Sequence, residues 1–386
     1  MRTIMDYLAT EFATFEEAPF CAVDALVLSE FCMVRMEHVL PPMRDEDTIG
    51  GKAVARLRSL LPRRGVHFRD ALLAEHYDDM FVGLMPDKVK ELMLALAASP
   101  RFRDMEMSEC ASVFDEEENT QFAALSFTYK NEFAFVGFRG TDCSFTGWRE
   151  DFDMAYMNRV PAQESSLRYL EAVMRRLPKK VYVGGHSKGG NLALYAAAMC
   201  GDKTARRISK VFSFDAPGFR PGVLGKAQRD RLSGMVERYV PHESLIGMLM
   251  DCPVPYAAVR SSAAGAWQHD PFSWGVDGFD FERCSGLASS AQFAHDVIGR
   301  WLARYDEDEA REIVDALFDA MRASGAHDFS DVLKFGPKTF SLLRDAAKNT
   351  DDATRVTLTA AIGDLAEAVA HRAWFGQEGE ARERRE

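Results

Sequence analysis

The sequence predicts an α/β fold in which a mostly parallel sheet is flanked by helical segments at both ends of the chain. Between about residues 120 and 260, short β-branched or aromatic runs alternate with helical stretches. Outside that part, apolar residues recur at helical spacing. With 386 residues, 47% of them hydrophobic, the chain can build one large core with accessory elements.

The N-terminal region, residues 1–115, is expected to be helical. Apolar residues follow helical spacing in 6–12, 22–36 and 89–99, and the Pro- and Gly-containing residues 41–51 interrupt the pattern. Two alternatives stay open for these helices. They either form a layer packed on the core or cap an active site.

Residues 116–284 are expected to form the α/β core. It opens with a hairpin of residues 121–129 and 132–138, whose turn contains Lys130 and Asn131. A helix over 164–177 follows, and another begins near Lys188. Further strands are predicted at 181–185, 211–215, 235–240 and 256–262.

Residues 285–386 are expected to form a C-terminal helical extension. Amphipathic patterns over 293–305, 310–325 and 357–372 predict three helices there.

Charge and cysteine content narrow the class of protein. A net charge of −12 argues against nucleic-acid binding, because no basic surface would follow the phosphates. Seven dispersed cysteines without a CxxC pair favour reduced thiols in the cytoplasm over disulfides or a zinc site. No apolar run approaches the roughly 18 residues of a membrane span, and Asp6 and Glu11 interrupt any signal peptide. We expect a cytoplasmic protein without stable membrane insertion.

Residues 181–199 carry the most specific motif. A β-branched strand leads into Gly185-His186-Ser187-Lys188-Gly189, and an Ala-rich helix follows. This is the G-x-S-x-G nucleophile elbow in the strand–turn–helix context that it requires. It predicts an α/β-hydrolase fold with Ser187 as the nucleophile, whereas His186 is expected to pack beside the elbow.

Two backbone N–H groups are candidate oxyanion donors. Lys188 follows the nucleophile at the start of a helix, where N–H groups are free. Upstream, the turn Arg139-Gly140-Thr141 follows an early strand, so that Thr141 can supply a second N–H, with its hydroxyl assisting. For Arg139 we expect a structural pairing with a carboxylate such as Asp151.

Several motifs resemble known families. FRGT followed by Trp148 and Asp151, then GHSxGG, resembles the fungal-type (class 3) lipases over roughly residues 120–270. The chain more closely resembles the Mbeg-like bacterial hydrolases, which have a lipase-type fold and poorly defined activity. The motifs shared with them are FRGTDCSFTGWREDF, VPAQ, GGHSKGGNLALYAA, DAPGF, VPHESLIGMLM and QHDPFSW.

The base is expected to be His269. In α/β-hydrolases the order along the chain is Ser, acid, His, and His269 lies in the loop after the last predicted strand. The family resemblance implies the same residue. His242, which directly follows the strand at 235–240, is the alternative.

The acid has two candidates, Asp215 and Glu243. Asp215 ends the strand at 211–215, and Glu243 follows the next strand. Class 3 lipases carry their aspartate after that later strand, but this chain places Ser244 at the matching position and departs from their pattern. An acid at Asp215, the end of the preceding strand, resembles the arrangement in pancreatic-type lipases. We therefore prefer Asp215. Asp215 is otherwise interpreted as a cap on the following turn.

The expected activity is hydrolysis of a small acyl ester through an acyl-enzyme, with Ser187, His269 and Asp215 as the triad and no metal or organic cofactor. Two alternatives stay open. One is an amidase or peptidase with the same triad. The other is a non-catalytic binding or scaffold protein built on a hydrolase core.

Overall fold

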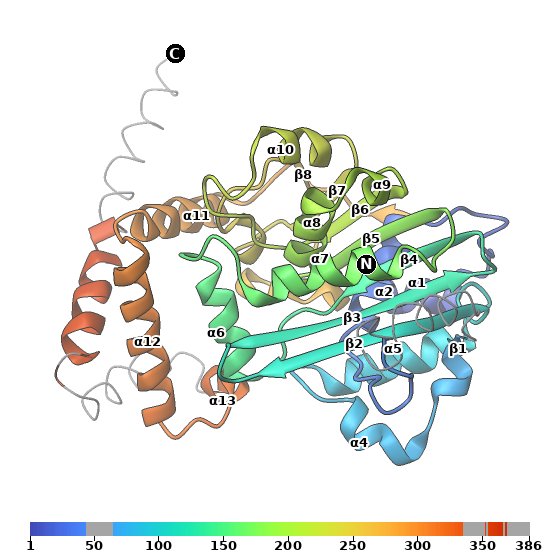
Figure 1. Ribbon diagram of the computed structural model, residues 1–386, viewed down its shortest axis with the longest axis horizontal. Coiled ribbons are helices and arrows are strands. Elements are labelled where there is room, and N and C mark those ends of the chain that lie inside the picture. The colour runs from blue at the N-terminus through green and yellow to red at the C-terminus, as the bar shows by residue number, and fades with distance from the viewer. Residues whose placement is uncertain (44–64, 335–351, 353, 366, 369–386) are drawn as a thin grey trace, which may run out of the picture.

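The computed structural model describes residues 1–43, 65–334, 352, 354–365 and 367–368, and its centre is an eight-stranded sheet (Figure 1). The strands lie side by side in chain order. The first four pair antiparallel, and β4 to β8 pair parallel, which confirms the predicted α/β class. The strands are β1 (Val66–His67), β2 (Met105–Asp115), β3 (Thr120–Tyr129), β4 (Phe133–Phe138), β5 (Lys180–His186), β6 (Ile208–Phe214), β7 (Val236–Pro241) and β8 (Tyr256–Val259).

The antiparallel side of the sheet is larger than the sequence predicts. The hairpin of β3 and β4 is confirmed, with Tyr129 opposite Phe133 across the turn. Strands β1 and β2 lie within residues 1–115, where only helices were expected, so that expectation is wrong for these two segments. The pairing of β2 with β3 shifts register between Ser108 and Ala111, and Glu109 has φ 53°. Such a bulge interrupts the alternation by which a strand is found in a sequence.

Helices cover both faces of the sheet. The face toward α7 (Pro161–Val173), α8 (Lys188–Met199) and α10 (Lys226–Ser233) buries Val136, while the opposite face buries Phe135. This alternation along β4 is what a strand buried on both sides requires. The N-terminal helices α1 (Ile4–Thr10), α2 (Ala22–Phe31) and α5 (Pro86–Ala98) share the hydrophobic cluster of the second face.

The C-terminal helices lie at one end of the molecule, beside α6 (Phe145–Asp153) (Figure 1). They are α11 (Ser289–Leu302), α12 (Glu307–Ala323) and α13 (Phe329–Lys334), and α12 packs Phe318 against Phe152 of α6. The helices predicted near 293–305 and 310–325 are thus confirmed. Of the helix predicted over 357–372, the described residues 357–365 and 367–368 are helical, and the remainder lies outside the described residues. The division of the chain at 115 and 284 stays a prediction.

Short elements complete the fold. They are α4 (Tyr77–Met80), α9 (Asp202–Ala205), the pair β9 (Val276–Asp277) and β10 (Asp280–Phe281), and the 3-10 helices Phe68–Ala71, Ala74–His76, Ile246–Met248, Gly265–His269 and Pro271–Ser273. Among the helices that the structure describes, none has the length and apolar character needed to cross a bilayer.

Candidate active site

Ser187 occupies a strained turn between β5 and α8. Its backbone has φ 56° and ψ −130°, a conformation that non-glycine residues rarely adopt. The turn is held because the Ser187 N–H donates to the carbonyl of Phe214 at the end of β6, at 2.9 Å. A Cβ atom at Gly189 would collide with the backbone of Phe138, so glycine lets α8 begin directly against β4.

The imidazole of His269 contacts the hydroxyl of Ser187. His269 ends the 3-10 helix Gly265–His269, in the chain that follows β8. Its Nε2 lies 3.0 Å from Ser187 Oγ, and 30% of its side chain is exposed. The structure therefore brings together a hydroxyl and a potential base that are 82 residues apart in the chain.

Asp215 lies against the other nitrogen of the same imidazole. It follows β6 directly, is 0% exposed, and places Oδ2 at 2.6 Å from His269 Nδ1. Its Oδ1 accepts hydrogen bonds from Ser244 Oγ at 2.5 Å and from the Gly247 N–H at 3.0 Å. These donors hold the carboxylate in one orientation toward the ring, an arrangement that would keep the Nδ1 proton in place.

Ser244 explains the departure from the lipase pattern. The residue lies where class 3 lipases carry an aspartate, and here its hydroxyl hydrogen-bonds to the Asp215 carboxylate from the neighbouring strand's end. The serine at this position thus helps to orient the carboxylate that follows β6.

Glu243, the alternative acid, has a different set of contacts. Its Oε2 accepts hydrogen bonds from the Gly265 N–H at 2.6 Å and from Gln268 Nε2 at 2.8 Å. Both donors belong to the 3-10 helix that carries His269. Glu243 therefore anchors this segment, while Asp215 contacts the imidazole. His242, the alternative base, places Nδ1 2.7 Å from the carbonyl of Gly286 instead.

The two candidate oxyanion donors belong to segments that adjoin the serine. Lys188 is the first residue of α8, and a Cβ atom built on Gly140, next to Thr141, would lie 3.7 Å from Ser187 Cβ. Within the described residues, the backbone N–H groups of Thr141 and Lys188 donate to no acceptor. Both are therefore available to a developing oxyanion.

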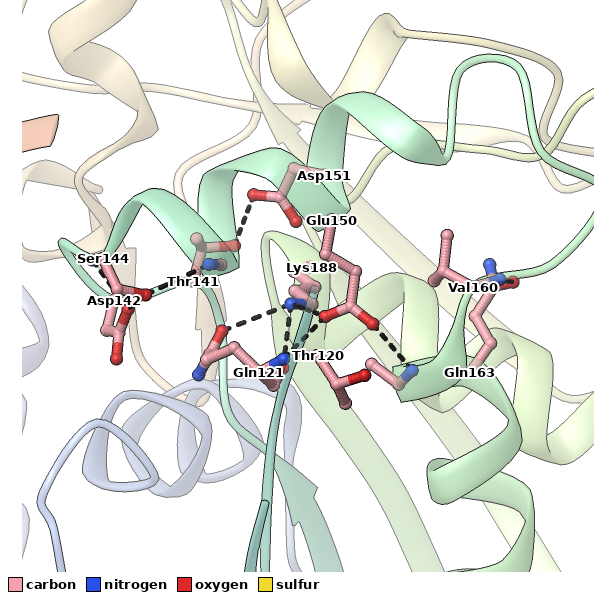
Figure 2. Close-up of polar contacts among 12 residues, drawn as sticks. Thr120, Gln121, Thr141, Asp142, Ser144, Glu150, Asp151, Val160, Gln163 and Lys188 are labelled. Atoms are coloured by element: carbon pink, nitrogen blue, oxygen red, sulfur yellow. Dashed lines mark hydrogen bonds and ion pairs between the residues drawn. The ribbon is translucent and has the colours of Figure 1, made fainter. Parts of the chain in front are cut away.

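The side chain of Thr141 points to a carboxylate. Its Oγ1 donates to Asp151 Oδ2 at 2.5 Å (Figure 2). Arg139 pairs with a carboxylate, as expected, but with Glu37 Oε1 at 3.2 Å and not with Asp151. It also donates to the carbonyls of Cys32 and Val34. These contacts of Arg139 connect the end of β4 to residues 32–37, which follow α2.

Asp151 is expected to make stability fall with rising pH. Burial raises its pKa from 3.8 to about 6, against the opposing effects of the Lys188 charge and the Thr141 hydrogen bond. The folded chain therefore holds a proton that the unfolded chain has released. The free energy of unfolding should decrease by on the order of 2 to 3 kcal/mol as the pH rises from about 4 to 6.

Asp151→Asn isolates this contribution, because it removes the titrating group. Urea unfolding of both proteins between pH 4 and 7 should show the variant gaining stability relative to the wild type as the pH rises. A constant difference across this window would contradict the assignment.

The structure shows a second histidine–carboxylate pair beside the first, and sequence reasoning found only its histidine. The ring of His186 packs against that of His269 in a tilted arrangement, with ring centroids 4.6 Å apart. Its Nδ1 lies 3.0 Å from Oε1 of the buried Glu30. Burial, the largest single effect, lowers the pKa of His186, but the charge and hydrogen bond of Glu30 together with the charges of Asp215 and Asp270 outweigh it, so the pKa is raised. The packing beside the elbow was expected. The partner was not, although acidic residues within the mostly apolar residues 22–31, which include Asp24 and Glu30, are a recognisable sign of buried carboxylates.

Sequence reasoning also missed Glu150, which contacts the side chain of Lys188. Only the backbone of Lys188 had been considered, although its ammonium group is buried and paired. Within the residues that the structure describes, no three His, Cys, Asp or Glu side chains converge as a metal site would require.

A strand, a serine in a strained turn and a helix on a mostly parallel sheet define the α/β-hydrolase fold. The chain belongs to the Mbeg1-like family, whose model matches residues 96–319, and the resemblance noted from the sequence is confirmed.

Two solved structures are similar to this chain. M37 lipase is 18% identical with a TM-score of 0.30, and the match covers 42% of this chain and 62% of M37 lipase. The chain thus spans less than two thirds of that protein. The lipase–propeptide complex of Rhizomucor miehei is 14% identical with a TM-score of 0.29, covering 61% of this chain and 84% of the other. No curated protein matches the sequence.

Proposed function

We propose that this chain is a serine hydrolase that cleaves small acyl esters through an acyl-enzyme. The observation that carries the proposal is the continuous contact from Ser187 Oγ through the imidazole of His269 to the buried Asp215. Each component has the neighbour that its role demands: a base beside the hydroxyl, and a carboxylate beside the second ring nitrogen.

The reaction begins when Ser187 Oγ attacks the ester carbonyl carbon and His269 Nε2 takes the hydroxyl proton. Asp215 stabilises the resulting imidazolium and keeps its orientation. The carbonyl oxygen, now negatively charged, receives hydrogen bonds from the Thr141 and Lys188 N–H groups. His269 then donates its proton to the leaving alcohol, and the acyl group stays on Ser187.

Water completes the cycle. His269 takes a proton from a water molecule, which attacks the acyl carbon. The second tetrahedral intermediate then collapses, the bond between Ser187 Oγ and the acyl carbon breaks, and His269 returns the proton to Oγ as the carboxylic acid leaves. The seven thiols, none of which forms a disulfide, fit the reducing cytoplasm, which we include in the proposal.

Labelling by a fluorophosphonate tests the proposal. Wild-type protein should be labelled at Ser187 and should hydrolyse p-nitrophenyl acetate or butyrate. Ser187→Ala should lose labelling and lower ester turnover by at least about 10⁴-fold, because the attacking atom is gone. Ser233→Ala, which changes an exposed serine on α10, is the matched control and should behave as wild type.

Three outcomes count against the proposal. Folded wild-type protein that resists both the probe and the esters would support a binding protein on a hydrolase core. Labelling at another serine would displace Ser187. Faster cleavage of a matched anilide than of its ester would make the chain an amidase.

A further inference from the structure

Lys188, the residue that follows the candidate nucleophile in the chain, forms a buried ion pair with Glu150 (Figure 2). Their side chains are 1% and 0% exposed, and Lys188 Nζ lies 2.5 Å from Glu150 Oε2. Nζ also donates to the backbone carbonyl of Gln121 at 2.8 Å and to its Oε1 at 3.2 Å. All three ammonium donors therefore have acceptors.

The carboxylate of Glu150 is equally well satisfied. Oε2 also accepts from the Gln121 N–H at 3.0 Å, and Oε1 accepts from the Ala162 N–H at 2.8 Å. The group thus joins β3, the start of α7 and the start of α8 to helix α6. Nothing in this network contacts Ser187 Oγ or His269, so the pair does not move the protons of the proposed reaction.

Charge at this position is not needed to form the elbow. The turn requires a backbone N–H after the serine, which any residue but proline supplies, and an apolar side chain would fill the buried space at lower desolvation cost. A buried ion pair contributes little net stability compared with well-packed apolar residues. Its directional contacts can, however, restrict where the attached backbone lies.

Asp151, which follows Glu150 in α6, binds the side chain of Thr141, the residue that supplies the other candidate N–H donor. Asp151 accepts the hydroxyl hydrogen bond of Thr141, and Glu150, one residue earlier, holds the ammonium of Lys188. The residues that supply both N–H groups are therefore tethered to two consecutive carboxylates on one helix, as Figure 2 shows. The position of α6 determines the spacing between the tethered segments.

We propose that the Lys188–Glu150 pair is a positioning pair, which holds the N–H of Lys188 at the place where the transition-state oxyanion forms. The inference rests on the proposed ester hydrolysis. Removal of one oxyanion donor typically lowers kcat by about 10²–10³-fold. If the ion pair is removed while the N–H is retained, we expect a smaller loss, a decrease in kcat of about 10–100-fold. KM should stay within about twofold of its wild-type value.

The test compares Lys188→Met with the uncharged double variant Lys188→Met/Glu150→Gln. Methionine preserves the backbone N–H and the length of the side chain. Glutamine can still accept from the N–H groups of Gln121 and Ala162. The double variant leaves no unpaired buried charge, so it should fold even where the single variant does not. Lys210→Met, which breaks an exposed pair with Glu237, is the control and should retain wild-type kcat.

Ester kinetics should be normalised to active sites counted by exhaustive fluorophosphonate titration. We expect the double variant to unfold near the wild-type temperature and yet to keep the 10–100-fold loss in kcat. The affinity for a trifluoromethyl ketone transition-state analogue should fall by a similar factor. If the double variant regains wild-type kcat as well as wild-type stability, the inference is overturned, since the pair would then be only structural.

Unchanged kcat in both variants would also overturn it while leaving the proposed function intact. Failure of the proposed function is distinguishable, because the wild type itself would then lack labelling and turnover.

Discussion

Replacing Asp215 with asparagine is expected to lower kcat for ester hydrolysis by about 10⁴-fold. In the proposed mechanism the carboxylate, which lies 2.6 Å from His269 Nδ1, accepts the Nδ1–H. Nε2, 3.0 Å from Ser187 Oγ, is then free to accept the proton of the hydroxyl. An asparagine amide can donate to Nδ1, and this favours the other tautomer, in which Nε2 carries the proton and cannot act as a base. Steady-state turnover of a p-nitrophenyl ester measures the loss.

Two comparisons make the Asp215→Asn result interpretable. Asp230→Asn changes an exposed carboxylate on α10 and should leave turnover unchanged. Glu243→Gln should have a much smaller effect than Asp215→Asn, because Glu243 contacts Gly265 and Gln268 and not the imidazole. A larger loss for Glu243→Gln would identify Glu243 as the acid. Denaturant unfolding of each variant separates lost chemistry from lost folding.

Arg101→Met is expected to lower the free energy of unfolding by about 3–5 kcal/mol. Arg101 and Asp24 are 0% exposed, and the guanidinium makes two hydrogen bonds to the carboxylate, at 2.8 and 2.6 Å. Methionine would leave the charge of Asp24 buried without its partner. The same guanidinium also donates to four backbone carbonyls in the segment between α1 and α2, those of Ala13, Thr14, Ala18 and Pro19.

Urea unfolding measures this effect, and Arg103→Met provides the control. Arg103 is two residues away and exposed, so its replacement should change the free energy of unfolding by less than about 0.5 kcal/mol. Equal stability of the two variants would show that Arg101 does not anchor the N-terminal segment. Spectroscopic probes near α1 and near the sheet should report the same transition if that segment unfolds with the core.

Local patterns predicted most of the parallel part of the fold. Residues 181–185 and 211–215 are short apolar runs next to glycines or helices, and such runs indicate buried strands wherever they occur. Strand β2 was not predicted because the bulge at Glu109 interrupts the alternation of buried and exposed residues, and because the second half of the strand is exposed. The partner strand β3, not the local pattern, keeps it in the sheet.

The sequence alone determined the family, the α/β class and the candidate serine, because a strand, a glycine turn and a helix must be consecutive to form an elbow. It could rank but not decide between Asp215 and Glu243, which follow adjacent parallel strands and so end at the same edge of the sheet. Only the tertiary structure decided which carboxylate meets the imidazole of His269 and which holds its loop. It also revealed the pairing of Lys188 with Glu150, because contacts between residues 38 positions apart depend on how helices pack and leave no local pattern.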